Sequence, residues 1–344
     1  MDFGLVESAE IQNVDFTLPP DGEHTLTMFK DRQRSVATDL RIGLAKWGRK
    51  EWVGKFYPNR TKEFQFLNEY TKRFNTIELN AVFYSIPPEN LIRNWKDMIS
   101  PEHQNDFLFL PKFSRVISHI KRLSNAEKET EQFINTVKLF GQHLGPILLQ
   151  IGDNFGPKKF MDLELFIKQL PTDQRFFIEL RQNEWFSDHI ERKAVFGLFA
   201  QYNIGSVITD TPGRRDCAHM ELTIPEVYIR FNGLGENFRT FDYSRIDNWV
   251  ARLKKWLESG LEKVYFIVSQ KDEVDTPALA RYAIEKFNKE LGAKIPLIVW
   301  DTDAPVTNVP MVSGAELLAK DIISAIENNE GEIIPPEADP KKPF

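Results

Sequence analysis

Cysteine is almost absent from this chain of 344 residues, in which Cys217 is the single one. No disulfide can form within the chain, and a zinc site built from several cysteines is excluded. We therefore expect a reducing, cytoplasmic location. The first ten residues, MDFGLVESAE, carry neither a basic stretch nor an apolar core, so we expect no signal peptide. Runs of about 18 apolar residues are missing too, which predicts that no segment spans a membrane.

Positive charge is not in excess, and histidine is scarce. The net charge of −6 gives no overall attraction to nucleic acid or to anionic lipid. There are six histidines, and only His119 and His219 lie near the ends of predicted strands. We therefore expect no site with several zinc ions, and we expect neither a metal nor a cofactor. The glycine-rich loops that bind phosphates and the GxSxG motif of hydrolases are also absent.

The chain does contain a regular alternation of apolar runs and amphipathic stretches, with 42% hydrophobic residues overall. Apolar residues near i, i+3, i+4 and i+7 predict helices at residues 61–74, 88–99, 125–144, 163–170, 190–202, 245–260 and 278–291. Eight short apolar runs predict buried strands at residues 39–47, 75–84, 106–113, 145–152, 175–182, 204–210, 227–233 and 263–270. Buried strands that alternate with helices form parallel β/α units, and eight such units predict a β/α (TIM) barrel.

Departures from this regularity occur in three places. Only about 15 residues, TPGRRDCAHMELTIP at 211–225 among them, lie between the sixth and seventh runs, so we expect the crossover after strand 6 to be shortened. Residues 1–36 are polar and acidic, and we interpret them as a lead segment that wraps the outside of the barrel or stays mobile. We place one barrel domain at residues 37–328, with a short extra strand at 295–300 and a C-terminal helix at 314–328, followed by a tail at 329–344.

Polar residues stand at the carboxyl ends of the predicted strands, where the active sites of such barrels are built. Residues two apart in a strand share a face, and three pairs fit this spacing: Glu78/Asn80, Glu179/Arg181 and Arg230/Asn232. The candidates for catalysis are Glu179, Glu78, Asp210 and His119. The candidates for ligand binding are Lys112, Arg115, Arg181, Arg230, Asn232, Arg215, Asn80, Tyr84, Trp47, Trp185 and Gln150.

The candidate site carries more cations than carboxylates. A cleft with a local positive field favours an anionic ligand such as a phosphate or a carboxylate. The loop TPGRRD, residues 211–216, adds two arginines and Gly213, which can adopt φ > 0 and help to form an anion-binding nest. The residues could supply ligands for two alternative metal sites: a zinc ion on His119, Glu179 and Asp210, or a hard cation on Glu78, Glu179 and Asp210. We expect Arg181 to weaken the second one.

Eight stretches in the order of the chain resemble the domain-of-unknown-function 72 family, also called YecE-like proteins. Among them are WGRKEWVGKFYP, FLPKFSRVISHIKRL, RFFIELRQNEWF and ITDTPGRRDCAHM, and together the eight cover roughly residues 40–290. The resemblance implies a β/α barrel, and it implies no established activity. Through the family, the resemblance also implies a relation to endonuclease IV-like barrels and hence a role with nucleic acid. The matching charged and aromatic residues are Glu78, Lys112, His119, Glu179, Arg181, Trp185, Asp210 and Arg230.

Three histidines of the family pattern are replaced here. Gln182, Asn232 and Ser269 stand where the family usually has histidine. These replacements count against a metal-dependent or histidine-based mechanism.

Three functions fit the residues. We favour an enzyme that acts on a phosphorylated or other anionic small molecule, with Glu179 as base and Lys112, Arg181 and Arg230 holding the anion. The second is a protein that binds or processes nucleic acid. In the third, the barrel is a non-catalytic ligand-binding or structural one, in which the charges at the strand ends neutralise one another.

Overall fold

The computed structural model describes residues 3–34, 37–271 and 273–298. The strands are β1 Asp39–Leu44, β2 Thr76–Leu79, β3 Leu108–Pro111, β4 Ile147–Gln150, β5 Phe176–Glu179, β6 Gly205–Asp210, β7 Glu226–Gly233 and β8 Lys263–Gln270. The α-helices are α1 Glu23–Phe29, α2 Phe66–Thr71, α3 Ala81–Tyr84, α4 Glu89–Asp97, α5 Glu127–Val137, α6 Phe160–Gln169, α7 Glu184–Ser187, α8 His189–Gln201, α9 Arg239–Glu258 and α10 Thr276–Lys286. None of the described helices is long and apolar enough to cross a bilayer.

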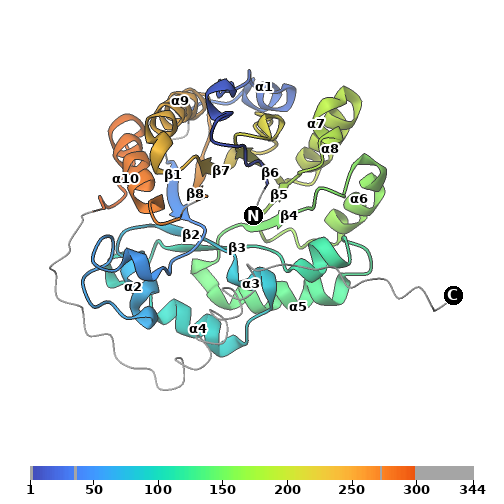
Figure 1. Ribbon diagram of the computed structural model, residues 1–344. Helices are drawn as coiled ribbons and strands as arrows, with labels where there is room; N and C mark the ends of the chain where they lie inside the picture. Colours follow the sequence, from blue (N-terminus) through green and yellow to red (C-terminus); the bar gives the residue numbers. More distant parts are fainter. Residues whose placement is uncertain (1–2, 35–36, 272, 299–344) are drawn as a thin grey trace, which may run out of the picture.

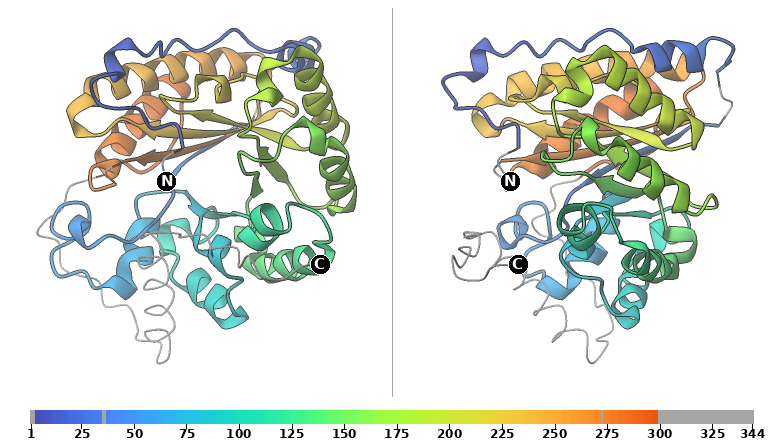
Figure 2. Two further views of the ribbon diagram at one scale, coloured as in Figure 1. Left: turned by 45° about the vertical axis from the view of Figure 1, so that its right-hand side comes forward. Right: turned by 90° about the vertical axis from the view of Figure 1, so that its right-hand side faces the viewer.

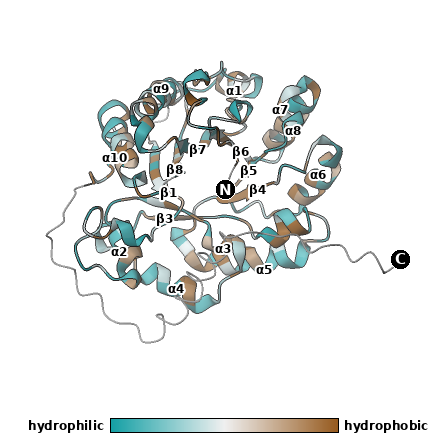
Figure 3. Ribbon diagram, in the orientation of Figure 1, coloured by the Kyte–Doolittle hydropathy of each residue, from teal (hydrophilic) through white to brown (hydrophobic). Residues whose placement is uncertain are grey.

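The eight predicted strands are all present, and every pairing between them is parallel. They form two sheets: a curled sheet of six strands in the order β1-β8-β7-β6-β5-β4, and a pair, β2-β3. Helices surround both sheets, and hydrophobic residues gather in the strands and on parts of the helices (Figures 1 and 3). The expected α/β architecture is thus confirmed, whereas one continuous eight-stranded ladder is not formed by the described residues.

Side chains connect the two sheets at the junction of β1 and β2. The amide of Asn75 accepts from the Ile42 N–H at 3.0 Å and donates to the Leu40 carbonyl at 2.9 Å. The Tyr70 hydroxyl accepts from the Leu44 N–H and donates to the Thr76 carbonyl. These bonds take the place of ladder bonds, so the backbone groups of β1 that face β2 are satisfied.

Isolated bridges connect the sheets at the other junction. Phe109 pairs with Leu144 and Lys112 pairs with Leu148 between the segments that contain β3 and β4. Backbone N–H groups of Gly145 and Phe113 donate across the same junction. Strands β3 and β4 therefore lie side by side although no regular ladder joins them.

The helix predictions need several corrections at the level of boundaries. The helix predicted at 61–74 is only α2, preceded by a single 3-10 turn, and the one predicted at 125–144 ends at Val137. Gly141, with φ 59° and ψ −127°, interrupts the helical turns that follow. Residues 295–298 of the predicted extra strand are not in a strand, and the C-terminal helix predicted at 314–328 lies outside the described residues.

The crossover between β6 and β7 is short, as predicted, and contains only a 3-10 turn at Arg215–Cys217. The lead segment supplies a helix at this place: α1 packs against α8 and against residues 220–222 (Figure 1). Before reaching it, the segment crosses the outer side of α9, where Arg252 binds Asp21 and the Pro19 carbonyl (Figure 2). The lead segment thus covers a part of the molecule that a full crossover helix would otherwise cover.

Buried polar contacts hold α1 in this position. The Thr25 hydroxyl donates to the Met220 carbonyl at 2.7 Å and accepts from the Leu222 N–H at 2.6 Å. The Glu221 carboxylate accepts from the His24 N–H at the first turn of α1, where the helix dipole favours negative charge. A Cβ on Gly22 would stand 2.0 Å from the carboxyl carbon of Glu221, so only glycine permits this approach.

We expect Thr25→Val to lower the free energy of unfolding by about 1–3 kcal/mol. The change keeps the shape of the side chain but leaves a buried carbonyl and a buried N–H without partners. Urea unfolding followed by circular dichroism would measure the loss. Thr27→Val is the matched control, because the exposed Thr27 hydroxyl bonds only to the Glu23 carbonyl within α1. Equal effects of the two changes would show that the Thr25 contacts do not anchor the segment.

Candidate functional site

The space enclosed by the strands contains a small apolar cluster, and a layer of polar side chains lies next to it, toward the carboxyl ends of the strands. The apolar cluster is made of Leu110, Leu148, Phe177, Val207, Ile224, Tyr228, Tyr265 and Ile267. Members of this cluster come from both sheets, which places the two sheets around one interior. Two positions further along β3 to β7, the same alternation puts polar side chains on the interior face. Together with Glu78 of β2 they form the polar layer: Glu78, Lys112, Gln150, Glu179, Thr209 and Arg230.

Arg230 is the centre of the polar layer. Its Nε and Nη2 donate to the two carboxylate oxygens of Glu78 at 3.0 and 2.9 Å, and its Nη1 donates to Glu179 at 2.8 Å. The hydroxyl of Tyr228 and the amide of Asn80 also donate to Glu78, each at 3.0 Å. Arg230 is therefore held between two carboxylates, and its hydrogen bonds are used within the protein.

Glu179 is bound by cations from two directions. Besides Arg230, it accepts from Arg181 Nε at 3.2 Å and from the Thr209 hydroxyl at 2.9 Å. Burial opposes ionisation of this carboxyl, but the charges of Arg181, Arg230 and Lys112 outweigh it and lower the pKa of Glu179 to about 2. A carboxylate with so low a pKa accepts protons weakly near neutral pH.

Lys112 has no carboxylate within hydrogen-bonding distance among the described residues. Its Nζ donates to Gln150 Oε1 at 2.8 Å and lies 4.1 Å from the centre of the Phe83 ring. Burial lowers the pKa of Lys112 to about 7, and repulsion by Arg230 acts in the same direction. Lys112 is thus the cation of the layer that gives up its proton most easily.

His119 and its neighbours form one edge of the site, next to Lys112. The His119 ring meets Phe83 edge-on at 5.3 Å, and Phe83 meets Tyr84 in the same way at 5.2 Å. Burial, followed by the charges of Lys112 and Arg181, lowers the pKa of His119 to about 4. Arg115 is half-buried close enough for its charge to act on His119 as well. The structure therefore brings His119, Tyr84 and Arg115 to the site, with His119 uncharged at neutral pH.

Asp210 and Arg215 lie apart from the polar layer. Thr209 faces the interior, so the next residue, Asp210, faces the surrounding helices. Its carboxylate pairs with Arg245 at 2.9 Å, with Arg215, and with the Trp249 indole N–H at 2.7 Å. Asp210 therefore does not converge with Glu78 and Glu179. Both candidate metal sites require Asp210 beside Glu179, and the structure does not place them together. Among the described residues, no three His, Cys, Asp or Glu side chains come together as ligands of a metal.

The remaining candidates divide between the rim and the core. The Asn232 side-chain oxygen accepts from the Ser269 hydroxyl at 2.7 Å. Two of the positions at which the family usually has histidine are therefore hydrogen-bonded to each other. Trp185 is fully buried, and its indole N–H donates to the Phe155 carbonyl. Trp47 is half-buried and packs edge-on against Trp95 at 5.4 Å.

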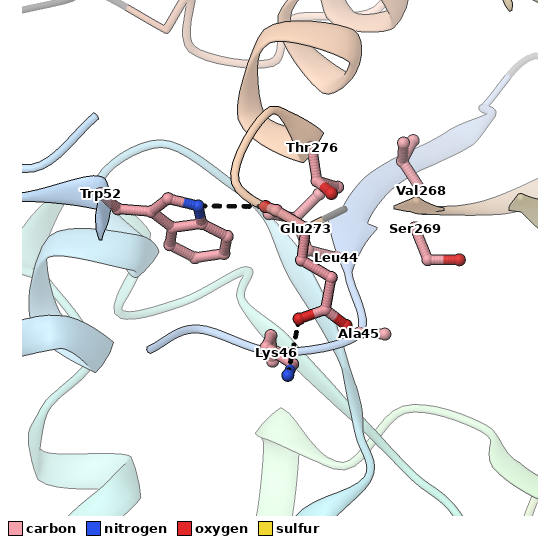
Figure 4. Close-up of a pocket in the computed structure, with 8 residues that line it drawn as sticks. All are labelled: Leu44, Ala45, Lys46, Trp52, Val268, Ser269, Glu273 and Thr276. Carbon is pink, nitrogen blue, oxygen red and sulfur yellow. Dashed lines mark hydrogen bonds and ion pairs between the residues drawn. The ribbon is translucent and has the colours of Figure 1, made fainter. Parts of the chain in front are cut away.

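A small pocket opens where β1 and β8 end, and Figure 4 shows its lining. Lys46 Nζ lies 2.6 Å from the Glu273 carboxylate, and the Trp52 indole donates to the Glu273 carbonyl at 3.1 Å. Lys46 is therefore neutralised by an acidic residue that the sequence did not place at the site. The positive excess at the strand ends is smaller than expected for this reason.

The N-terminal segment covers the Arg181 side of the site. The Phe3 ring centre lies 4.0 Å from Arg181 Cζ and 5.1 Å from Arg214 Cζ. The Gly4 carbonyl accepts from the Gly213 N–H at 2.8 Å and from the Thr211 hydroxyl at 3.2 Å. In Figure 1 the dark-blue segment leads into the ring of strand ends. Nothing in the local sequence around Phe3 indicated this position.

Gly213 plays a different role from the one predicted. It does not adopt a positive φ, so the expected nest geometry is wrong at this residue. A Cβ on Gly213 would stand 3.1 Å from the Gly4 carbonyl and from the Leu5 carbonyl oxygen. Glycine gives the N-terminal segment room to approach closely here, and the N–H that was expected to bind an anion binds the Gly4 carbonyl.

Comparison with known proteins gives the same architecture and a family. The model of a family described as "Protein of unknown function DUF72" matches residues 41–299. This chain belongs to the DUF72 family. UPF0759 protein YecE of Escherichia coli, from strain K12 and from O157:H7, is 24% identical over 280 residues, which cover 75% of this chain and 97% of that protein.

Solved structures of the DUF72 family share the fold. A DUF72 family protein (EF0366) from Enterococcus faecalis V583 is similar with a TM-score of 0.58 and 20% identity, over 76% of this chain and all of the other. A second structure of that protein gives a TM-score of 0.57 and 18% identity. The family therefore accounts for the fold and for the matching motifs, and it assigns no activity.

Proposed function

We propose that the DUF72 site of this chain binds a small anionic molecule at the carboxyl ends of the strands. The supporting observation is a count of buried charges in the polar layer and directly above it. Three cations, Lys112, Arg181 and Arg230, stand against two carboxylates, Glu78 and Glu179. A buried charge without a partner is costly, and the lowered pKa of Lys112 is one sign of that cost. A bound anion would supply the missing negative charge.

Two of the three cations are suited to hold the anion. Arg230 is surrounded by Glu78 and Glu179, and four of its five N–H groups donate within the protein. Arg181 donates its Nε–H to Glu179, and its guanidinium lies against the Phe3 ring at the outer side of the polar layer. Lys112 has three N–H groups when it is protonated, and Gln150 takes one of them. Arg181 and Lys112 therefore bind the anion in this proposal, with Arg115 and His119 beside them.

The same geometry changes the expected catalytic roles. Glu179 was expected to act as a base, but its low pKa and its three donors favour a structural role. Lys112, with a pKa of about 7, is the residue of the layer best suited to exchange a proton near neutral pH. We propose that the protein is an enzyme whose proton-transfer group is Lys112, acting on the bound anion.

In this proposal, the two sheets together form one closed barrel. The support comes from the shared apolar cluster, the Asn75 and Tyr70 bonds at the β1–β2 junction, and the two bridges at the β3–β4 junction. A closed barrel brings Glu78 of the two-stranded sheet to Arg230 of the six-stranded sheet. No comparable observation favours nucleic acid as the ligand.

We expect sulfate and phosphate to raise the melting temperature of the protein. A ligand at about 100 times its Kd adds roughly 2.7 kcal/mol to the stability of the folded state. The increase should be lost in Arg181→Gln. Arg175→Gln is the matched control, because Arg175 also pairs with a buried glutamate, Glu226, but precedes β5 at the opposite end of the strands. Scanning calorimetry with increasing anion concentration would measure the effect.

Two results would contradict the proposal. One is the absence of any concentration-dependent stabilisation by either anion. The other is an equal stabilisation of wild type, Arg181→Gln and Arg175→Gln, which would show a general salt effect instead of a site.

A further inference from the structure

The N-terminal segment places the Phe3 ring and the Gly4 carbonyl oxygen in the site, and each of them has specific partners. The Phe3 ring lies over the guanidinium groups of Arg181 and Arg214. One residue later, the Gly4 carbonyl oxygen receives two hydrogen bonds, from the Gly213 N–H and from the Thr211 hydroxyl. Phe3 and Gly4 therefore show which chemical groups fit this part of the site.

Each of these two subsites prefers a particular chemistry. An aromatic face over a guanidinium is attracted to its charge, and the attraction grows where water is excluded, as beside the almost fully buried Arg181. The oxygen subsite offers two hydrogen-bond donors, the Gly213 N–H and the Thr211 hydroxyl. A carboxylate oxygen would form charge-assisted bonds there, which are stronger than those of a neutral carbonyl.

The segment is partly exposed at this point, and the Phe3 ring also packs against the hydrophobic core. Phe3 and Gly4 are both partly exposed, and Leu5 after them is exposed. Gly4 adopts φ +72°, and a Cβ there would meet the Thr211 side chain at 2.4 Å, so a close fit is achieved by the absence of a side chain. A free molecule with the same groups would compete with Phe3 and Gly4 for these partners.

We propose that the place held by Phe3 and Gly4 is a binding site for a small carboxylate that carries an aromatic ring. This inference rests on the proposed anion site and names the class of its ligand. The ring would stack on Arg181 and Arg214, and one carboxylate oxygen would take the position of the Gly4 carbonyl oxygen. The N-terminal segment then competes with this ligand from within the same chain.

The test uses the full-length chain with Phe3→Ala, which vacates the ring subsite. The probe is 3-phenylpropanoylglycine, because its ring, linker and terminal carboxylate reproduce the side chain of Phe3, the peptide bond and Gly4. The matched probe 3-cyclohexylpropanoylglycine has the same charge and a similar size but no aromatic face. The amide of the first probe keeps the ring and the carbonyl but removes the charge. Isothermal titration calorimetry gives each Kd.

We expect Phe3→Ala to bind the aromatic probe about fivefold or more tightly than wild type, because the competing ring is gone. The cyclohexyl probe should bind the variant about two- to fivefold more weakly than the aromatic one, the range of an exposed to partly buried cation–π contact. The neutral amide should bind more weakly still. Thr211→Val in the same background should weaken the aromatic probe and the cyclohexyl probe to a similar extent, since both carry the carboxylate.

Failure of this inference is distinguishable from failure of the proposed function. Equal affinities for the aromatic and the cyclohexyl probe, or no gain in Phe3→Ala, would overturn the inference even if sulfate still binds through Arg181. The absence of binding by sulfate and by all three probes, in wild type and in Phe3→Ala, would overturn both.

Discussion

Replacement of Arg230 by methionine should lower the free energy of unfolding by about 3–5 kcal/mol, the usual cost of breaking a buried ion pair. Methionine keeps most of the aliphatic stem and removes the guanidinium. Glu78 and Glu179 would then remain buried and would each lose a partner at hydrogen-bonding distance. Urea unfolding at pH 7, with the midpoint and the slope both recorded, would measure the loss. We expect this to be the largest effect of any single change in the polar layer.

The matched control is Arg175→Met, which also removes an arginine from a glutamate. Arg175 is more exposed than Arg230, and its partner Glu226 also pairs with Lys263 at 3.6 Å, so we expect a smaller loss than in Arg230→Met. A second control is the double variant Glu78→Gln/Arg230→Met, in which a neutral amide replaces one of the unpaired carboxylates. It should recover part of the lost stability. A loss below about 1 kcal/mol in Arg230→Met alone would show that Arg230 does not neutralise the two carboxylates.

The grouping of Glu78, Glu179 and Arg230 could be predicted from the sequence because it follows from the alternation of side chains along the strands. Residues two apart share a face, and the carboxyl ends of parallel strands meet at one end of the barrel. Glu78, Glu179 and Arg230 met both conditions, and in the structure Arg230 lies within 3 Å of each carboxylate, in two ion pairs. The same reasoning applied strictly would have excluded Asp210, because Val207 and Thr209 already occupy the interior face of β6.

Other features depend on contacts between distant segments, and no local pattern encodes them. The short crossover after β6 was visible as a gap of about 15 residues, but nothing in the gap predicts that α1 covers it. The partners of Asp210 come from α9, and Phe3 reaches Arg181 across almost 180 positions of sequence. Glu273 and Asp216 likewise neutralise Lys46 and Arg214, so the positive excess was overestimated.

We expect the affinity for sulfate to be constant below pH 7 and to fall above it, by up to about tenfold per pH unit. The cause is Lys112, whose pKa is lowered to about 7 from its ordinary value of 10.5, chiefly by burial. Below pH 7 the ammonium group is charged and can bind the anion, whereas above pH 7 the neutral amine cannot. Sulfate is the suitable probe because its own charge does not change between pH 6 and 9. Calorimetric titrations across this range would measure the effect.

The variant Lys112→Met separates this explanation from a general loss of positive charge. Its affinity for sulfate should be low and independent of pH over the same range. The stability of the free protein provides a second readout with a fixed sign. Between pH 7 and 10.5 the unfolded chain holds a proton on Lys112 that the folded chain has released, so the wild-type stability should rise with pH in this window. A pH-dependent affinity that persists in Lys112→Met would assign the titration to another group and remove Lys112 from the site.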